Sequence, residues 1–274
     1  MRCTTTTKRS SENDLWVLLE CLGRILSTAP QPRPSSGGGR HNEGRVGFRS
    51  IRSWPGLCLG FVTQARHSED IDLSYVIPLL FHGDDADSHR RRSFYICTLA
   101  SPLCEFDCAW DSRILLACLD NSRTLAESYD VLDTWMVYSF TELQEGAFFT
   151  VNPWGDAFDR GKTGPCCGPY RAVLAGLKGD EKFMQRTLKL TTSWISEGVC
   201  MYCAAQKNGE LLYTHFGPDA AHRQTLVSNE DFFASGCRAN AWLRLPGFHV
   251  ERVFLDWLHL VDLALTPESA ASAS

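Results

Sequence analysis

Three short apolar runs in succession, each rich in β-forming residues, constrain the fold of this chain more than any other feature. Runs of this length and composition predict β-strands, and the basic turn between the first two predicts an antiparallel hairpin. Pro78 is expected to interrupt the first strand, because proline cannot donate to a strand ladder. A three-stranded meander is therefore expected from residues 71–85 (IDLSYVIPLLFHGDD), 92–101 (RSFYICTLAS) and 112–120 (SRILLACLD).

The segment after the third run has the periodicity of a helix. Residues 124–146 have no internal Gly or Pro, and large apolar residues recur there at spacings of three and four. Further along, Ala172–Leu177 fits either a strand or a helical turn, and Asp180 is a natural N-cap for a helix over 181–189. This order predicts a mixed α/β domain over 71–274. The apolar positions of the long helix are Leu125, Tyr129, Leu132, Met136, Phe140 and Leu143.

Residues 1–70 are expected to form an irregular N-terminal extension. Within it, 27–50 are dense in Pro, Gly, Ser and Arg and have almost no large apolar residue, which is typical of a disordered linker. The apolar stretch 14–26 is broken by Glu20 and Arg24, so it fits an amphipathic helix better than a secretory signal.

Charge and cysteine content limit the partners and the compartment. The net charge of −5 argues against a nucleic-acid-binding surface over the whole molecule, so clusters such as Arg90–Arg92 are interpreted as solvated turns. No run approaches the roughly 18 apolar residues that cross a bilayer, so no membrane is expected as a partner. The chain has 12 cysteines and no convincing secretory signal, which predicts an intracellular protein whose thiols are free and mostly buried.

The most specific local motif is the Cys-x-x-Cys pair of Cys200 and Cys203. Such a pair supplies half of the four ligands of a structural zinc site. The same pair could also line a core with small side chains, and a redox motif is disfavoured because no βαβ context surrounds it. The residues eligible to complete a zinc site are Cys166 or Cys167, His215, His222 and Cys237.

Acidic residues follow apolar runs at three distant points, Asp84, Asp180 and Asp256. Acids at strand ends can converge in space and hold Mg²⁺ or Mn²⁺ for phosphoryl transfer. A metal would also relieve the repulsion among Asp84, Asp85 and Asp87. The alternative is that these acids form turns and caps in solvent.

The order of these motifs resembles the catalytic core of transposon-derived proteins related to the CACTA and Plavaka types of DNA transposase. The likeness covers residues 71–274. It rests on HGD at 82–84, VLAGLKGDEKF at 173–183, the Cys-x-x-Cys insert and PGFHVERVFLDWLHLVDLAL at 246–265.

This resemblance implies an RNase H-like sheet that carries out metal-dependent hydrolysis and strand transfer on DNA at transposon ends, in the nucleus. Asp84 then matches the acid of the first strand and Asp180 the acid after the fourth. Cys200 and Cys203 match a zinc-binding insertion, here at about 190–245. Asp256 and His259 match an Asp-x-x-His element, with Asp256 as a third catalytic candidate.

Two departures from the family pattern indicate a truncated or degenerate copy. The sequence stops where the family has a further helical region that often holds the third acid, and the first 70 residues contain no DNA-binding module. A second hypothesis follows, a domesticated domain that binds nucleic acid or protein without cutting it.

Overall fold

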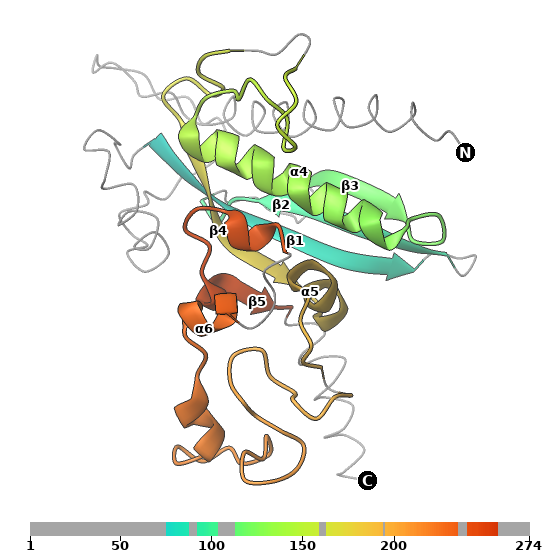
Figure 1. Ribbon diagram of the computed structural model, residues 1–274, viewed down its shortest axis with the longest axis vertical. Helices are drawn as coiled ribbons and strands as arrows, with labels where there is room; N and C mark the ends of the chain where they lie inside the picture. Colours follow the sequence, from blue (N-terminus) through green and yellow to red (C-terminus); the bar gives the residue numbers. More distant parts are fainter. Residues whose placement is uncertain are drawn as a thin grey trace, which may run out of the picture. The chain divides into compact units, whose positions relative to one another are not determined.

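A five-stranded sheet is the central feature of the structure (Figure 1). Along the chain, helices follow the third and the fourth strand. Several predicted features lie outside the described residues, namely the N-terminal extension over 1–70, Arg90 and Arg91, Cys237 and His259. None of the described helices is both long and apolar enough to cross a lipid bilayer. The computed structural model describes residues 75–87, 92–103, 113–158, 163–193, 195–234 and 240–256.

The fold is mixed α/β, and its sheet is mixed, with the strand order β3-β2-β1-β4-β5. β4 and β5 run parallel, with Gly179 opposite Leu255 in their register. The strands are β1 (Val76–Asp87), β2 (Ser93–Ala100), β3 (Ile114–Asp120), β4 (Arg171–Gly179) and β5 (Val253–Leu255). The helices are α4 (Ala126–Glu145), α5 (Glu181–Leu188) and α6 (Asn229–Ala234), and short 3-10 helices cover Ala221–Thr225, Trp242–Arg244 and Val250–Arg252.

The elements predicted from local sequence signals are present. β1, β2 and β3 are neighbours in the sheet, and the long helix follows them. The run at Ala172–Leu177 is a strand, because it continues into the buried centre of β4 rather than closing a helical turn. Asp180 caps α5, and its carboxylate accepts a hydrogen bond from the backbone N–H of Phe183 at 2.6 Å.

Two local predictions are wrong. Pro78 does not interrupt β1, which continues through it near the start of the strand, and its carbonyl accepts a hydrogen bond from the Ser101 hydroxyl at 2.9 Å. Leu125 does not belong to the buried face of the long helix. It precedes the first helical residue of α4 and is 69% exposed.

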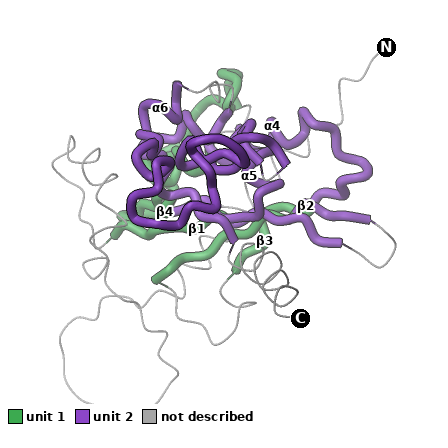
Figure 2. The backbone as a smooth tube through the Cα atoms, turned by 90° about the horizontal axis from the view of Figure 1, so that it is seen from below, with its two compact units in different colours: residues 1–81, 96–118, 138–175 green, residues 82–95, 119–137, 176–274 purple. Residues whose placement is uncertain are grey.

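The described residues fall into two units (Figure 2). The first comprises residues up to 81, 96–118 and 138–175, and the second comprises 82–95, 119–137 and 176 onward. In the first unit Phe81 of β1 meets Phe140 of α4 edge to face, with 6.3 Å between ring centroids. In the second, Trp242 is fully buried.

Within the second unit, α5 is fixed to the sheet by one aromatic ring resting on two glycines. A Cβ atom at Gly83 of β1 would lie 1.9 Å from the ring of Phe183, and one at Gly179 of β4 would lie 2.3 Å from it. The same ring is stacked on Tyr95 of β2, at 6.1 Å between centroids. Only residues without a Cβ allow this close approach, so the two glycines decide where α5 lies.

We expect Gly83→Ala to lower the free energy of unfolding by roughly 1–3 kcal/mol, the usual cost of overpacking. The three atoms nearest to its new methyl group all belong to the Phe183 ring, so Phe183→Leu should relieve part of the cost. The new methyl group of Gly179→Ala would also meet the Gly83 carbonyl oxygen, 2.6 Å away. Phe183→Leu should therefore recover less of the free energy of unfolding lost in Gly179→Ala than of that lost in Gly83→Ala. Chemical denaturation of the single and double variants measures both couplings, and equal relief would contradict this packing.

Candidate functional site

The three predicted catalytic acids belong to three neighbouring strands: Asp84 lies within β1, three residues before its end, and Asp180 and Asp256 directly follow β4 and β5. The three strands meet at Gly179, the residue before Asp180. The Gly179 carbonyl accepts a hydrogen bond from the backbone N–H of Asp256 at 2.8 Å. The Gly83 carbonyl, which precedes Asp84, lies against Gly179 from the other side. The backbones of these three positions therefore lie beside one another, and the convergence of their carboxylates on one ion stays a prediction.

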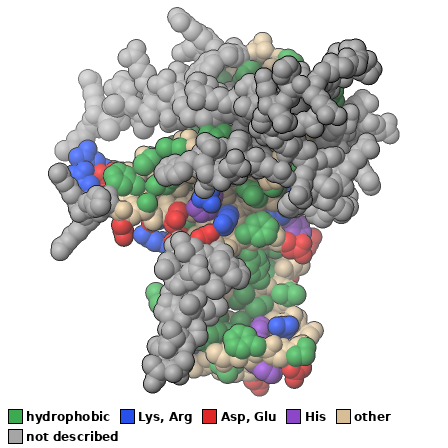
Figure 3. All heavy atoms as spheres, turned by 180° about the vertical axis from the view of Figure 1, so that it is seen from behind, with side chains coloured by type: hydrophobic (Ala, Val, Ile, Leu, Met, Phe, Trp, Pro, Cys, Tyr) green, Lys and Arg blue, Asp and Glu red, His purple; other side chains and the backbone are tan. Residues whose placement is uncertain are grey.

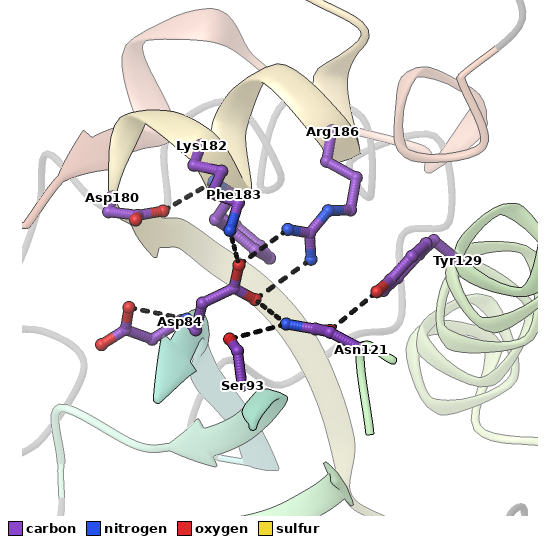
Figure 4. Close-up of polar contacts among 9 residues, drawn as sticks. Asp84, Ser93, Asn121, Tyr129, Asp180, Lys182, Phe183 and Arg186 are labelled. Atoms are coloured by element: carbon purple, nitrogen blue, oxygen red, sulfur yellow. Dashed lines mark hydrogen bonds and ion pairs between the residues drawn. The ribbon is translucent and has the colours of Figure 1, made fainter. Parts of the chain in front are cut away.

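The carboxylates of Asp84 and Asp180 both have backbone partners. Asp84 Oδ1 accepts a hydrogen bond from the Asp85 N–H at 2.8 Å, and Asp180 Oδ1 accepts one from the Phe183 N–H. Side chains alternate between the faces of a strand, so Asp84 and Asp85 point to opposite faces of β1. Figure 4 shows the Asp84 side chain directed away from Arg186 and Asn121.

Asp256 has a cationic partner from the neighbouring strand. Its Oδ1 lies 2.7 Å from Nζ of Lys178 on β4, and its side chain is only 13% exposed. This ion pair balances the charge of the third candidate acid without a metal.

A metal cluster of three protein side chains is absent from the described residues: no three His, Cys, Asp or Glu side chains there are gathered closely enough to hold an ion. Mg²⁺, however, commonly uses only one or two protein carboxylates, together with water and substrate phosphates. The oxygen donors of Asp84 and Asp180 are of the type that this ion prefers.

Asp85 is surrounded by protein cations, which sequence reasoning missed. Arg186 of α5 donates to both of its carboxylate oxygens, at 3.3 and 3.0 Å, and Lys182 Nζ lies 2.5 Å from Oδ2. Asn121 donates a further hydrogen bond to Oδ1 at 3.3 Å. The repulsion expected among the clustered acids is therefore relieved at Asp85 by the protein itself.

The Arg186 guanidinium is held in place by two aromatic rings. Its Cζ lies 4.7 Å from the ring centroid of Tyr95 and 4.4 Å from that of Tyr129. The Tyr129 hydroxyl donates to the Asn121 side-chain oxygen at 2.7 Å, and Asn121 also donates to Ser93 Oγ at 2.9 Å (Figure 4). The ring contacts and these hydrogen bonds hold the planar guanidinium of Arg186 opposite the carboxylate of Asp85.

The sequence contained a signal for this contact. Alternation along β1 places Asp85 on the same face as Phe81 and Gly83, both of which are buried. A carboxylate on such a face requires a cation. Lys182 and Arg186, four residues apart on one predicted helix, lie on one face of that helix and were candidates for it.

Burial disfavours the ionised form of Asp85, but hydrogen bonds from Arg186 and Lys182 outweigh it and hold its pKa below the usual value. A lowered pKa stabilises the fold above the ordinary pKa of about 4, and this contribution is lost as the pH falls through the folded pKa. We expect Asp85→Ala to lower the free energy of unfolding at pH 7 by about 2 kcal/mol, because it leaves Arg186 partly buried without its partner.

The difference between Asp85→Ala and the parent chain should shrink as the pH is lowered below about 4. Lys182→Ala is the matched control. Its side chain is 64% exposed, so its loss should cost under about 1 kcal/mol. Denaturant titrations over pH 3 to 8 measure these values, and a pH-independent difference would exclude the proposed charge pairing.

A second buried acid, Asp133 on α4, was also missed by sequence reasoning. It is 4% exposed, and its Oδ1 has no hydrogen-bond partner. Burial raises the pKa of Asp133 to about 7, against smaller opposing contributions from Trp242 and Lys189. An acid of this kind titrates near neutral pH instead of near pH 4.

Because the folded chain holds the Asp133 proton up to about pH 7, it binds more protons than the unfolded chain between about pH 4 and 7. The free energy of unfolding should therefore fall as the pH rises through this window and level off above it. Asp133→Asn should remove this fall and be more stable than the parent chain at pH 8, by on the order of 2–4 kcal/mol. Thermal or chemical denaturation at pH 5 and 8 tests this. A variant less stable than the parent at pH 8 would show that Asp133 is ionised without penalty.

The Cys-x-x-Cys motif lies in a loop fastened to β5. The Tyr202 hydroxyl donates to the Val253 carbonyl, and the Tyr202 N–H approaches Cys200 Sγ at 3.3 Å. Burial and the neighbouring Cys200 thiol raise the pKa of Cys203. Two thiols are thus adjacent in a loop that contacts β5, the strand that precedes Asp256.

The other predicted zinc ligands do not join this pair within the part of the chain that is described. His215 lies 3.8 Å from Asp219, and Cys166 and Cys167 belong to the other unit. The described residues therefore supply two of the four ligands that a structural zinc needs, and zinc binding stays a prediction. The described cysteines are free as predicted, but the prediction that most are buried is wrong for them, because only Cys97 is buried.

Comparison with known proteins identifies no relative of this chain: no family model, no curated protein and no solved structure matches it. The functional argument therefore depends on the residues and their geometry.

Proposed function

We propose that residues 71–274 form an RNase H-like domain that carries out divalent-metal-dependent hydrolysis and transfer of DNA phosphodiesters, as in transposase cores. The observation that carries this proposal is that three neighbouring strands meet at Gly179, which puts the backbones of Asp84, Asp180 and Asp256 beside one another. Neighbouring strands lie about 4.8 Å apart, so carboxylates on adjacent strand ends can share one ion.

The order of elements supports the same proposal. An RNase H-like fold requires three meander strands, a helix, a fourth strand and a fifth strand after an insertion. β1, β2, β3, α4 and β4 occur in that order, and β5 follows a long segment that contains the Cys-x-x-Cys loop. β1 lies between β2 and β4, so the strand that carries the first acid is a neighbour of the strand that precedes the second.

Asp84 and Asp180 are the residues that would hold Mg²⁺ or Mn²⁺, which would supply charge stabilisation and an activated water for phosphodiester cleavage. Asp180 uses one carboxylate oxygen to cap α5, and a carboxylate has acceptor sites on both oxygens. Its second oxygen can serve as a ligand without loss of the cap. Asp256 is the weaker candidate, because Lys178 already neutralises it.

DNA contact in this proposal is local. The net charge of −5 opposes broad phosphate binding. On the face drawn in Figure 3, the described Lys and Arg side chains stand among Asp and Glu side chains. A nucleic-acid substrate would therefore be recognised near the strand ends.

A second candidate function is that of a transposase-derived domain that binds nucleic acid or protein and has lost catalysis. The observation that favours it is that Asp180 and Asp256 both have partners inside the protein, the Phe183 N–H and the Lys178 ammonium group. In that case the acids stabilise the strand ends, and DNA or a protein binds without being cut.

The two functions are separated by a cleavage assay on a labelled DNA duplex with Mg²⁺, Mn²⁺ or EDTA. We expect metal-dependent cleavage by the parent chain and a loss of about 100-fold or more in Asp84→Asn and Asp180→Asn, since a catalytic metal contributes several kcal/mol. Asparagine keeps the capping hydrogen bond of Asp180 and so limits the structural effect of that change.

Asp87→Asn is the matched control, because Asp87 belongs to the same acidic cluster but lies exposed at the last position of β1. It should cleave like the parent chain. Equal loss in all three variants would indicate a general effect of charge and contradict the assigned roles. DNA binding without cleavage by the parent chain would select the second candidate.

A further inference from the structure

The loop that carries the Cys-x-x-Cys motif is a hairpin over residues 197–208, with the motif at its tip. At the base of this hairpin the Lys207 N–H donates to the Glu197 carbonyl at 3.0 Å. Next to this bond, Gly198 and Gln206 form an antiparallel bridge. These contacts bring the two ends of the hairpin together.

One pair of side chains completes the base of the hairpin. Glu197 Oε1 accepts a hydrogen bond from the Asn208 backbone N–H at 2.9 Å, and its Oε2 accepts one from Asn208 Nδ2 at 3.1 Å. Both residues are exposed to solvent. A carboxylate can only accept hydrogen bonds, so the contact at Oε2 requires the amide donor of Asn208.

The residue after Asn208 is a glycine with an accessible backbone nitrogen. Gly209 is exposed, lies outside the helices and strands, and has a φ of 92°, which favours glycine over other residues. Among the described residues, none accepts a hydrogen bond from the Gly209 N–H. With neither a hydrogen-bond partner nor a Cβ atom beside it, this nitrogen can approach the side chain of Asn208.

We propose that Asn208 is a site of spontaneous deamidation, at which the Gly209 nitrogen closes a ring on the Asn208 side chain and the resulting carboxylate opens the hairpin at its base. Because ammonia is lost, the change accumulates with the age of the protein. The site uses none of the residues assigned to phosphodiester chemistry, so the proposal stands or falls independently of the proposed function.

The reaction has two steps, and water is its only co-reactant. The Gly209 N–H loses its proton to hydroxide, and the nitrogen attacks Cγ of Asn208. The bond from Cγ to Nδ2 breaks, and ammonia leaves with a proton from solvent, so that a cyclic imide remains. Water then opens this ring. Cleavage between the Gly209 nitrogen and Cγ gives aspartate, and cleavage between that nitrogen and the main-chain carbonyl carbon of residue 208 gives isoaspartate.

The product cannot keep the contact that closes the hairpin. Aspartate at position 208 has no side-chain N–H, and its carboxylate replaces the amide group that lies 3.1 Å from Glu197 Oε2. Two carboxylates at such a distance repel each other. Isoaspartate also adds one carbon atom to the main chain at this point. Both products therefore weaken the base of the hairpin that holds Cys200 and Cys203.

The first test incubates the full chain in mildly alkaline buffer made with oxygen-18 water and then digests it with trypsin in ordinary water. Residues 208–223 form a tryptic peptide with one asparagine and no glutamine, so its gain in mass reports Asn208 alone. Product formed during the incubation carries the heavy oxygen, whereas product formed during digestion does not. Asn152 is the internal reference and should stay unmodified, because Pro153 after it has no N–H to attack.

Substitutions test the effect on the hairpin. Asn208→Asp mimics the product and should speed amide hydrogen exchange in the hairpin by about fivefold, the factor that corresponds to one ordinary hydrogen bond. Adding Glu197→Gln should restore the parent rate, because the glutamine amide can donate to the new carboxylate. Glu210→Gln, which removes another exposed charge near the turn, is the matched control and should not restore it.

The proposal is overturned if the peptide of residues 208–223 gains no heavy oxygen, or if Asn208 converts no faster than Asn152. It is also overturned if the hairpin of Asn208→Asp exchanges at the parent rate, because the new carboxylate would then leave the base of the hairpin closed.

Discussion

The position of α5 depends on the Phe183 ring lying flat over two strands that present no side chain beneath it. Glycines at 83 and 179 remove the Cβ atoms from two adjacent strands, and Tyr95 on a third strand stacks against the ring. This contact fixes the distance between helix and sheet. It also fixes which face of the helix meets β1, and with it the positions of Lys182 and Arg186.

The alternation of side chains along β1 then gives two neighbouring acids different roles. Asp85 points to the helix-covered face, where Arg186 and Lys182 balance its charge, and Asp84 points to the other face. A shift of one residue in the register of β1 would exchange them and place the cations of α5 against Asp84. The glycine contact at Gly83 excludes that shift, because the next residue has a side chain. The packing of one ring therefore determines which acid of the cluster faces the cations of α5.

The sequence predicted the elements whose signals are local. The long helix and the capping role of Asp180 each depend on residues within a few positions of one another, and the structure confirms them. The run before Asp180 fitted either a strand or a helical turn, and the structure shows a strand. The charge pairing of Asp85 could not be predicted in the same way, because its partner Arg186 is 101 residues away. Nor could the environment of Asp133, where burial raises the pKa and Trp242, from a distant segment, opposes that rise. The continuation of β1 through Pro78 also depends on a tertiary contact, with Ser101.

The three predicted catalytic acids differ in how strongly their partners within the protein would compete with a metal ion. A lysine ammonium group and a divalent cation compete for the same charge, so the ion pair with Lys178 must break before Asp256 can bind a metal strongly. A backbone N–H does not compete in this way, because it occupies one acceptor site and leaves the negative charge in place. The backbone N–H groups of Asp85 and Phe183, which bond to Asp84 and Asp180, are partners of the second kind. In the proposed function, a cation held by Asp84 and Asp180 would also relieve the repulsion between two carboxylates on adjacent strands, which is why these two acids are proposed as its ligands before Asp256.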